Sequence, residues 1–169
     1  MQRRLWILAA LAAPATLTFS ACGFALRQAP DFAFKSLYSS LPEGSSLGIE
    51  LRRSLQATGK VRVITESKRI AEAEVILESL SDQRERVIVS ANSAGQVREI
   101  VLRMRFRFRL RTPGGVVLIP ETELLLEREI SFNETAVLAN EAEERLLYRD
   151  MQSDIVQQLL RRLAAVRIA

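Results

Sequence analysis

The chain has 169 residues, of which 48% are hydrophobic and 26% are charged, and its formal net charge is +4. These values are ordinary for one globular domain with a hydrophobic core. Because there is no histidine and only one cysteine, the sequence argues against an internal disulfide, most metal sites and most acid–base or nucleophilic catalysis.

The N-terminal segment has the pattern of a lipoprotein signal peptide. Arg3 and Arg4 precede an apolar stretch, residues 5–17, which is too short to span a bilayer. The segment ends in F-S-A-C, in which small residues lead to Cys22 as in a bacterial lipobox. We therefore expect cleavage after Ala21 and acylation of Cys22. A plain secretory signal followed by a buried cysteine is the alternative.

This pattern divides the chain into a signal peptide, residues 1–21, and a single domain, residues 22–169, that is anchored through Cys22. Several acyl chains on one cysteine would hold the domain stably at a membrane. Loss of Arg3 and Arg4 with the signal lowers the formal charge from +4 to +2. A domain so close to neutral gives no indication of nucleic-acid binding.

The first part of the domain is expected to form a strand, a helix and a short second strand. Apolar residues recur every four positions over residues 47–58, which predicts an amphipathic helix. Ser46 is placed to cap its N-terminus, and Gly59 follows its last residue. Apolar stretches on either side, residues 32–39 and 61–64, predict the strands. The polar stretch that follows is expected to be irregular.

Residues 97–111 form the most regular pattern in the chain. Their even positions are apolar from Ile100 onward, and their odd positions are arginine from Arg103 onward. Because side chains alternate faces along a strand, this period of two predicts a long strand with one apolar face and one arginine face. The arginine face, called here the arginine stripe, consists of Arg103, Arg105, Arg107, Arg109 and Arg111.

Long strands on both sides of this segment are expected to complete an antiparallel meander. Residues 73–90 predict a strand with a bulge near residues 79–81, joined to the arginine strand by a turn at residues 92–95. After a second turn, T-P-G-G, residues 116–132 predict a strand with glutamates at odd positions. Each arginine of the stripe then has a glutamate opposite or diagonal to it.

Two interpretations of the arginine stripe remain open. A solvated face that is neutralised by glutamates is favoured, and a surface that faces phosphate groups is the alternative. We expect Arg105 and Arg107, in the middle of the strand, to be the most fully paired. Arg98 and Arg103 lie nearer the turn at residues 92–95 and are expected to have fewer carboxylates within reach.

A long amphipathic helix is expected from about residue 136 to residue 166, where glycine and proline are absent and apolar residues recur every four or five positions. A break near Asn140, which with Glu143 resembles a capping box, is the alternative to one continuous helix. The helix is expected to cover the apolar face of the sheet rather than to lie on a membrane, because its polar face lacks basic enrichment. The predicted fold is α+β, a mixed, largely antiparallel sheet with two helices packed on one face.

No catalytic constellation is present in the sequence. The paired serines have no histidine partner, and Gly114-Gly115 lacks the lysine that a phosphate-binding loop requires. Glutamates opposite arginines stay ionised, which is unsuitable for a general acid. We expect a non-enzymatic protein with no metal and no cofactor other than the covalent lipid on Cys22.

The chain resembles the LptE family of lipopolysaccharide (LPS)-assembly lipoproteins over nearly its whole length. The resemblance rests on C-G-F-A-L-R at residues 22–27, on the order of strands and helices, and on A-V-L-A-N-E-A-E-E-R-L-L-Y-R-D-M at residues 136–151. It implies a lipoprotein anchored at the periplasmic face of the outer membrane of a Gram-negative bacterium. There it would plug the LptD β-barrel, help that barrel assemble and take part in placing LPS on the cell surface.

The resemblance implies LPS contacts at two places where family members carry basic residues, and neither is basic in this chain. The turn at residues 92–95 is N-S-A-G, and the start of the last helix has Asn140. The nearest basic candidates for LPS binding are Arg86, Arg98, Arg103 and Arg105. An auxiliary lipoprotein of a periplasmic lipid-transport ABC system is the alternative function, and a lipid-anchored inhibitor or adhesin is a third.

We predict that the mature protein begins with a diacylglyceryl-modified Cys22. Mass spectrometry of the protein isolated from membranes measures both the N-terminus and the added lipid. An unmodified thiol at Cys22, or cleavage at another bond, would contradict the lipobox interpretation.

Overall fold

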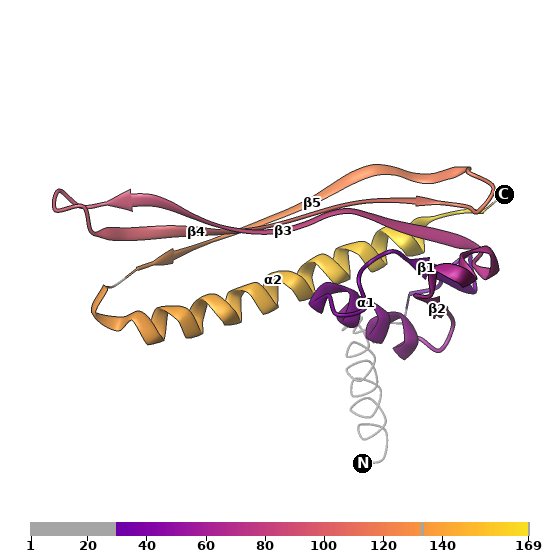
Figure 1. Cartoon of the computed structure of the whole chain (residues 1–169), viewed down its shortest axis with the longest axis horizontal. Helices are drawn as coiled ribbons and strands as arrows, with labels where there is room; N and C mark the ends of the chain where they lie inside the picture. Colours follow the sequence, from indigo (N-terminus) through magenta and orange to yellow (C-terminus); the bar gives the residue numbers. More distant parts are fainter. Residues whose placement is uncertain (1–29, 133, 169) are drawn as a thin grey trace, which may run out of the picture.

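The computed structural model describes residues 30–132 and 134–168, and a sheet of three long antiparallel strands dominates it (Figure 1). The segment expected to be a signal peptide, residues 1–21, and Cys22 lie outside the described residues. The three strands are β3 (Val75–Ala91), β4 (Val97–Arg111) and β5 (Val117–Ser131). They form the expected meander, and the register of β3 against β4 shifts between Ser79 and Ser81, where the bulge was predicted.

Shorter elements extend the sheet on the far side of β3. They are β1 (Ser36–Ser39), α1 (Ser46–Ala57), β2 (Arg62–Ile64) and the 3-10 helix η1 (Ser67–Glu72). The strand order is β2-β1-β3-β4-β5, with β1 parallel to both of its neighbours. The sheet is therefore mixed but mostly antiparallel, as the sequence predicts.

Three local expectations in this region are wrong. The first strand begins at Ser36 instead of residue 32, because β2 offers only a short ladder that starts opposite Ser36. The cap of α1 is Ser45, whose hydroxyl accepts from the Gly48 N–H, instead of Ser46. The segment expected to be irregular contains η1.

The long helix α2 (Val137–Ala165) follows the 3-10 turn η2 (Glu134–Ala136) and runs beneath the sheet on the same side as α1 (Figure 1). It is continuous, so the alternative of a break at Asn140 is wrong. Asn140 is buried against the rest of the protein, and burial suits an inner helix position better than an exposed cap. In the described ranges, no helix is long and apolar enough to cross a bilayer.

The core lies between α2 and the apolar face of β4. The fully buried residues of β4 are Ile100, Leu102, Met104, Phe106, Phe108 and Leu110. Those of α2 are Met151, Ile155, Val156, Leu159 and Leu163. The apolar face of β4 is thus removed from water by α2, and α1 completes the cover through Leu47, Leu51 and Leu55.

We expect Leu159→Ala to lower the free energy of unfolding by about 2–5 kcal/mol, because its side chain is 0% exposed and truncation leaves a cavity. Leu138→Ala on the same helix is the matched control, since Leu138 is 82% exposed and its truncation should cost less than about 0.5 kcal/mol. Urea unfolding measures both. Equal losses in the two variants would contradict the packing of α2 on β4.

Candidate functional site

The face of the sheet opposite the helices carries the arginine stripe, paired with glutamates from both neighbouring strands. Arg103 lies between Glu127 of β5 and Glu85 of β3, with N–O distances of 2.6 and 3.4 Å. Farther along the strand, Arg107 reaches Glu121 at 3.1 Å. The predicted pairing of arginines with glutamates across the hairpin is therefore confirmed.

Glu78 of β3 holds the far end of the stripe. Its Oε1 accepts from Arg111 Nε at 2.6 Å, and its Oε2 accepts from Arg109 Nε at 2.9 Å. The hydrogen bond from Arg111, followed by that from Arg109, holds the pKa of the Glu78 carboxyl below its usual value against the opposing effect of burial. With its side chain 21% exposed, Glu78 is the best-enclosed acid of the stripe.

The expected ranking of the arginines is wrong for Arg105 and Arg103, because the strand register decides what flanks each one. Arg105 lies opposite Gln83 and Leu125, so its ion pair with Glu123 spans 3.8 Å. Its Nε is enclosed without a hydrogen-bond partner among the described residues. Arg103 has two carboxylate partners instead of few, and the hydrogen bond to its β5 glutamate is the main cause of its raised pKa.

A second set of arginines projects on the helix side of the sheet. Arg84 and Arg86 of β3 and Arg128 of β5 lie opposite buried residues of β4, and residues that pair across strands share a face. Arg86 pairs with Glu144 of α2 at 3.4 Å, and Arg128 pairs with Asp154 at 3.2 Å. The sequence analysis missed Arg84 and Arg128, although the phase of each strand relative to β4 could have revealed them.

Arg84 belongs to a polar network that joins β3 to both helices. Its Nη2 donates to Gln152 Oε1 at 2.7 Å and to Ser46 Oγ at 2.8 Å. The side-chain nitrogen of Gln152 donates in turn to Glu50 Oε2 at 2.5 Å and to the Ser46 carbonyl oxygen at 3.2 Å. Because Gln152 is buried, leaving it unpaired would be costly, so the network fixes the position of Arg84.

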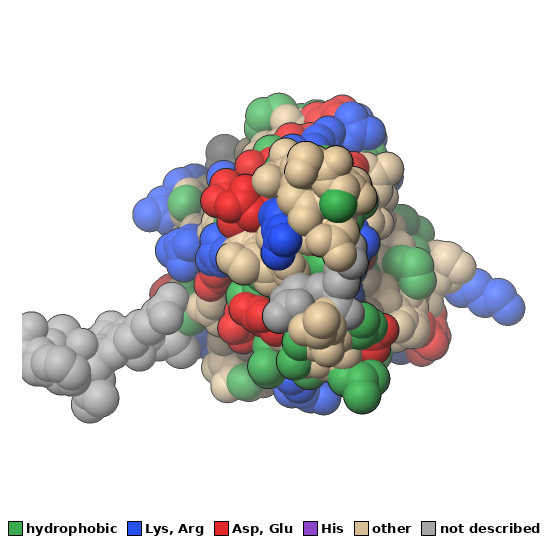
Figure 2. All heavy atoms as spheres, turned by 90° about the vertical axis from the view of Figure 1, so that its left-hand side faces the viewer, with side chains coloured by type: hydrophobic (Ala, Val, Ile, Leu, Met, Phe, Trp, Pro, Cys, Tyr) green, Lys and Arg blue, Asp and Glu red, His purple; other side chains and the backbone are tan. Residues whose placement is uncertain are grey.

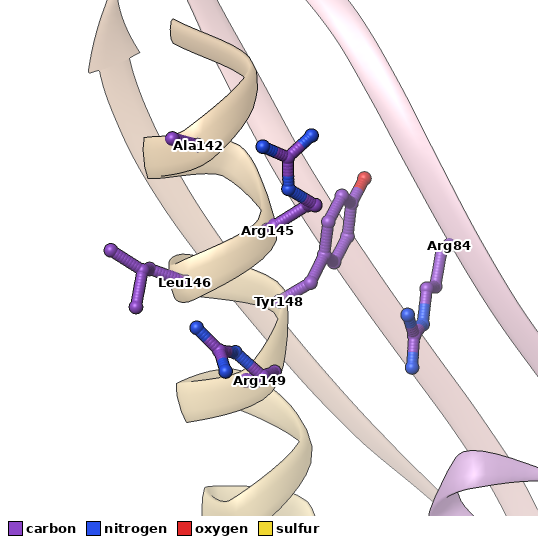
Figure 3. Close-up of a pocket in the computed structure, with 6 residues that line it drawn as sticks. All are labelled: Arg84, Ala142, Arg145, Leu146, Tyr148 and Arg149. Atoms are coloured by element: carbon purple, nitrogen blue, oxygen red, sulfur yellow. The ribbon is translucent and has the colours of Figure 1, made fainter. Parts of the chain in front are cut away.

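Two neighbouring cavities open between the N-terminal half of α2 and the sheet. The larger, of about 530 Å³, is lined by Arg84, Ala142, Arg145, Leu146, Tyr148 and Arg149 (Figure 3). The smaller, of about 370 Å³, is lined by Arg86, Phe132, Val137, Asn140, Glu141, Glu144, Arg145 and Tyr148. They share Arg145 and Tyr148, so they belong to one continuous surface.

Figure 2 views the molecule from the end that carries the β3–β4 turn and the start of α2, where hydrophobic side chains reach the surface. The exposed large apolar residues in these elements include Ile88, Val89, Val137 and Leu138. Arg98, also in this region, is exposed and forms no ion pair with the described residues.

Across the described ranges, no group of three potential metal ligands occurs.

The chain matches the family model of LptE, described as lipopolysaccharide-assembly, over residues 34–163. The protein belongs to the LptE family. No curated protein matches the chain.

Solved structures of lipoproteins share the LptE fold described here. The solution NMR structure of an uncharacterized lipoprotein B from Nitrosomonas europaea is 35% identical, with a TM-score of 0.70 over 85% of this chain and 91% of that one. A minor lipoprotein from Acinetobacter baumannii is 21% identical, with a TM-score of 0.64 over 82% and 98% of the two chains. The rare lipoprotein B from Shewanella oneidensis is 23% identical, with a TM-score of 0.63 over 77% and 92%.

The four arginines predicted from the LptE resemblance to contact LPS do not form one site. Arg86 and Arg98 lie on the helix side of the sheet, whereas Arg103 and Arg105 lie on the opposite face. Arg86 and Arg103 are held by carboxylates, Arg105 is held loosely, and Arg98 projects into solvent. The structure thus separates arginines that the sequence analysis grouped.

We expect Glu78→Gln to lower the free energy of unfolding at pH 7 by about 1–3 kcal/mol, because two arginines lose their carboxylate partner. The pKa of Glu78 is lower in the folded protein than its usual 4.5, so the stabilisation is complete above that value and is lost as the pH falls through the folded-state pKa. The difference between parent and variant should therefore shrink in acid.

Urea unfolding at pH 7 and at about pH 3 tests this linkage. Glu121→Gln is the control, because this glutamate pairs with Arg107 at 55% exposure, and exposed pairs contribute less than about 1 kcal/mol. A Glu78→Gln loss that is the same at both pH values would contradict the assigned role.

Proposed function

We propose that this protein is the lipoprotein component of an outer-membrane LPS translocon, where it plugs an LptD-like β-barrel, helps that barrel assemble and takes part in delivering LPS to the cell surface. Membership of the LptE family over residues 34–163 carries the proposal. In this role the protein is non-enzymatic, needs no cofactor, and is held at the periplasmic face of the outer membrane by acylated Cys22 after removal of residues 1–21.

The surface chemistry of the sheet supports a position inside a barrel. The interior of a transmembrane β-barrel is polar, and the arginine stripe presents a polar face whose charges are mostly neutralised by its own glutamates. Such a face can lie against a polar wall without burying an unpaired charge, which would be costly. This face extends along β4 from Arg103 to Arg111, on the side of the elongated sheet that faces away from α2 (Figure 1).

Affinity isolation from mildly solubilised outer membranes tests the partnership. A large β-barrel should co-purify with the tagged protein. Recovery of an inner-membrane ABC transporter instead would support the alternative of a lipid-transport lipoprotein, and recovery of neither would contradict both proposals.

The LPS contacts in this role are proposed among Arg86, Arg98, Arg103 and Arg105. Phosphates of LPS would be bound by charge-assisted hydrogen bonds, which an arginine already held by a carboxylate offers less readily. Arg98 is therefore the leading candidate, because it is exposed and has no ion pair with the described residues. It also lies at the end of the molecule that exposes apolar side chains (Figure 2), which suits the acyl chains of LPS.

We expect Arg98→Ala to weaken LPS binding by up to about tenfold, and a tenfold loss corresponds to about 1.4 kcal/mol of binding free energy. The free energy of unfolding should not change. Arg107→Ala is the matched control on the same strand: it should lower stability by less than about 1 kcal/mol and leave LPS binding unchanged. Binding of LPS to the mature protein is measured at two salt concentrations, since a surface charge contact weakens with salt. Equal binding by parent and both variants would remove Arg98 from the site.

A further inference from the structure

The larger cavity beside α2 differs from its neighbour in charge. Three of its six lining residues are arginines, Arg84, Arg145 and Arg149, and none is acidic. The adjoining smaller cavity has two arginines and two glutamates, Glu141 and Glu144. The basic cavity therefore lies directly beside a cavity whose positive and negative lining residues are equal in number, and both border the same helix.

The arginines of this cavity are poorly neutralised. Arg84 is fixed by the uncharged groups of Gln152 and Ser46 and lies over the ring of Tyr148, with the guanidinium carbon 5.5 Å from the ring centroid. Asp82 acts on it electrostatically but makes no ion pair with it among the described contacts. Arg149 is exposed and has no side-chain partner in the described part of the chain.

Arg145 adds a third cation that is only loosely held. Its ion pair with Glu141 spans 3.8 Å, and the arginine side chain is 69% exposed. An exposed pair of this length contributes little, so Arg145 can turn to a ligand at small cost. The cavity thus combines one guanidinium group that is fixed by hydrogen bonds, that of Arg84, with two that are exposed.

The same cavity has an apolar side. Leu146 is 52% exposed, and Ala142 lies one turn before it on α2 (Figure 3). The ring of Tyr148 forms part of the wall, and its hydroxyl is occupied by donating to the Glu85 carbonyl oxygen at 2.7 Å. A small anion alone would leave this apolar surface in water, whereas an anion that carries an acyl chain would cover it.

We propose that this cavity binds the phosphate end of an amphiphile, with Arg84 and Arg149 on the phosphate and the first part of the acyl chain along Leu146 and Ala142. Arginine suits this task because its planar, weakly hydrated guanidinium group presents several donors to one phosphate. Only the source of the amphiphile, the phosphorylated lipid of LPS, rests on the proposed function. The site is distinct from Arg98 at the end of the sheet.

The mature chain, residues 22–169, tests the proposal when it carries Cys22→Ser, so that no detergent is needed. All described elements lie within it. The probe is dihexanoyl phosphatidate below its micelle concentration, followed by isothermal titration calorimetry and by amide NMR shifts. The shifts should gather at residues 142–149 and 84. Dihexanoyl phosphatidylcholine and inorganic phosphate should each bind at least about tenfold more weakly than phosphatidate. Phosphatidylcholine lacks the net negative charge that the arginines recognise, and inorganic phosphate lacks the acyl chain that covers the apolar side.

Two substitutions separate the two halves of the site. Arg149→Gln should weaken phosphatidate binding about tenfold, whereas the control Arg161→Gln, an exposed arginine on the same helix that lines a different groove, should leave it unchanged. Leu146→Ser should weaken phosphatidate binding and leave the weak binding of inorganic phosphate unaltered. Thermal unfolding of each variant shows that the fold is intact.

Three outcomes would overturn the inference. They are no phosphatidate binding by the parent, equal losses in Arg149→Gln and Arg161→Gln, and inorganic phosphate binding as tightly as phosphatidate with no effect of Leu146→Ser. The last would assign a site for free phosphate. Because recovery of a β-barrel from membranes is a separate measurement, failure here leaves the proposed function standing, and failure there leaves the phosphate site standing.

Discussion

The structure depends on the need to remove the apolar face of β4 from water. Six alternating side chains of this strand are fully buried, from Ile100 to Leu110, and alternation places the arginine stripe on the opposite face. A slip of one residue would expose this core and bury arginine, so the register is strongly fixed. The positions of β3, β5 and α2 all follow from that register, because each must either pair with β4 or cover it.

The fixed register also distributes the charges of the protein between two kinds of environment. On the open face, arginines meet glutamates of the neighbouring strands and become structural, as Glu78 shows. On the helix face, arginines of β3 and β5 extend past the edge of the core to α2. Arg86 and Arg128 form ion pairs with acidic residues of α2, whereas Arg84 donates to the uncharged side chain of Gln152. The arginines that remain available for ligands are therefore Arg84, the exposed arginines in the N-terminal half of α2, and Arg98 at the end of the sheet.

Much of the fold could be predicted from the sequence because it follows from periodicity. The bounds of β4 follow from a period of two, and the bulge at Ser79–Ser81 follows from a shift in the phase of the apolar residues. The extent of α2 follows from apolar residues that recur every four or five positions in a segment without glycine or proline. The late start of the first strand could not be predicted, and neither could the choice between one continuous helix and a break at Asn140, since both depend on which partner is nearby. The pairing of Arg103 and Arg105 depends on register to a single residue, and the Arg84 network joins residues that are far apart in sequence.

Native-state hydrogen exchange measures most directly whether the sheet and α2 form one cooperative unit. Amides of β4 from residue 100 to 110 and of α2 from residue 151 to 163 should exchange only through global unfolding, and so with the same free energy. The turn at residues 92–96 and the first turns of α2 should exchange through local opening. If the second half of α2 exchanged at much lower free energy while β4 stayed protected, the sheet would be stable without its cover, and the account would be contradicted.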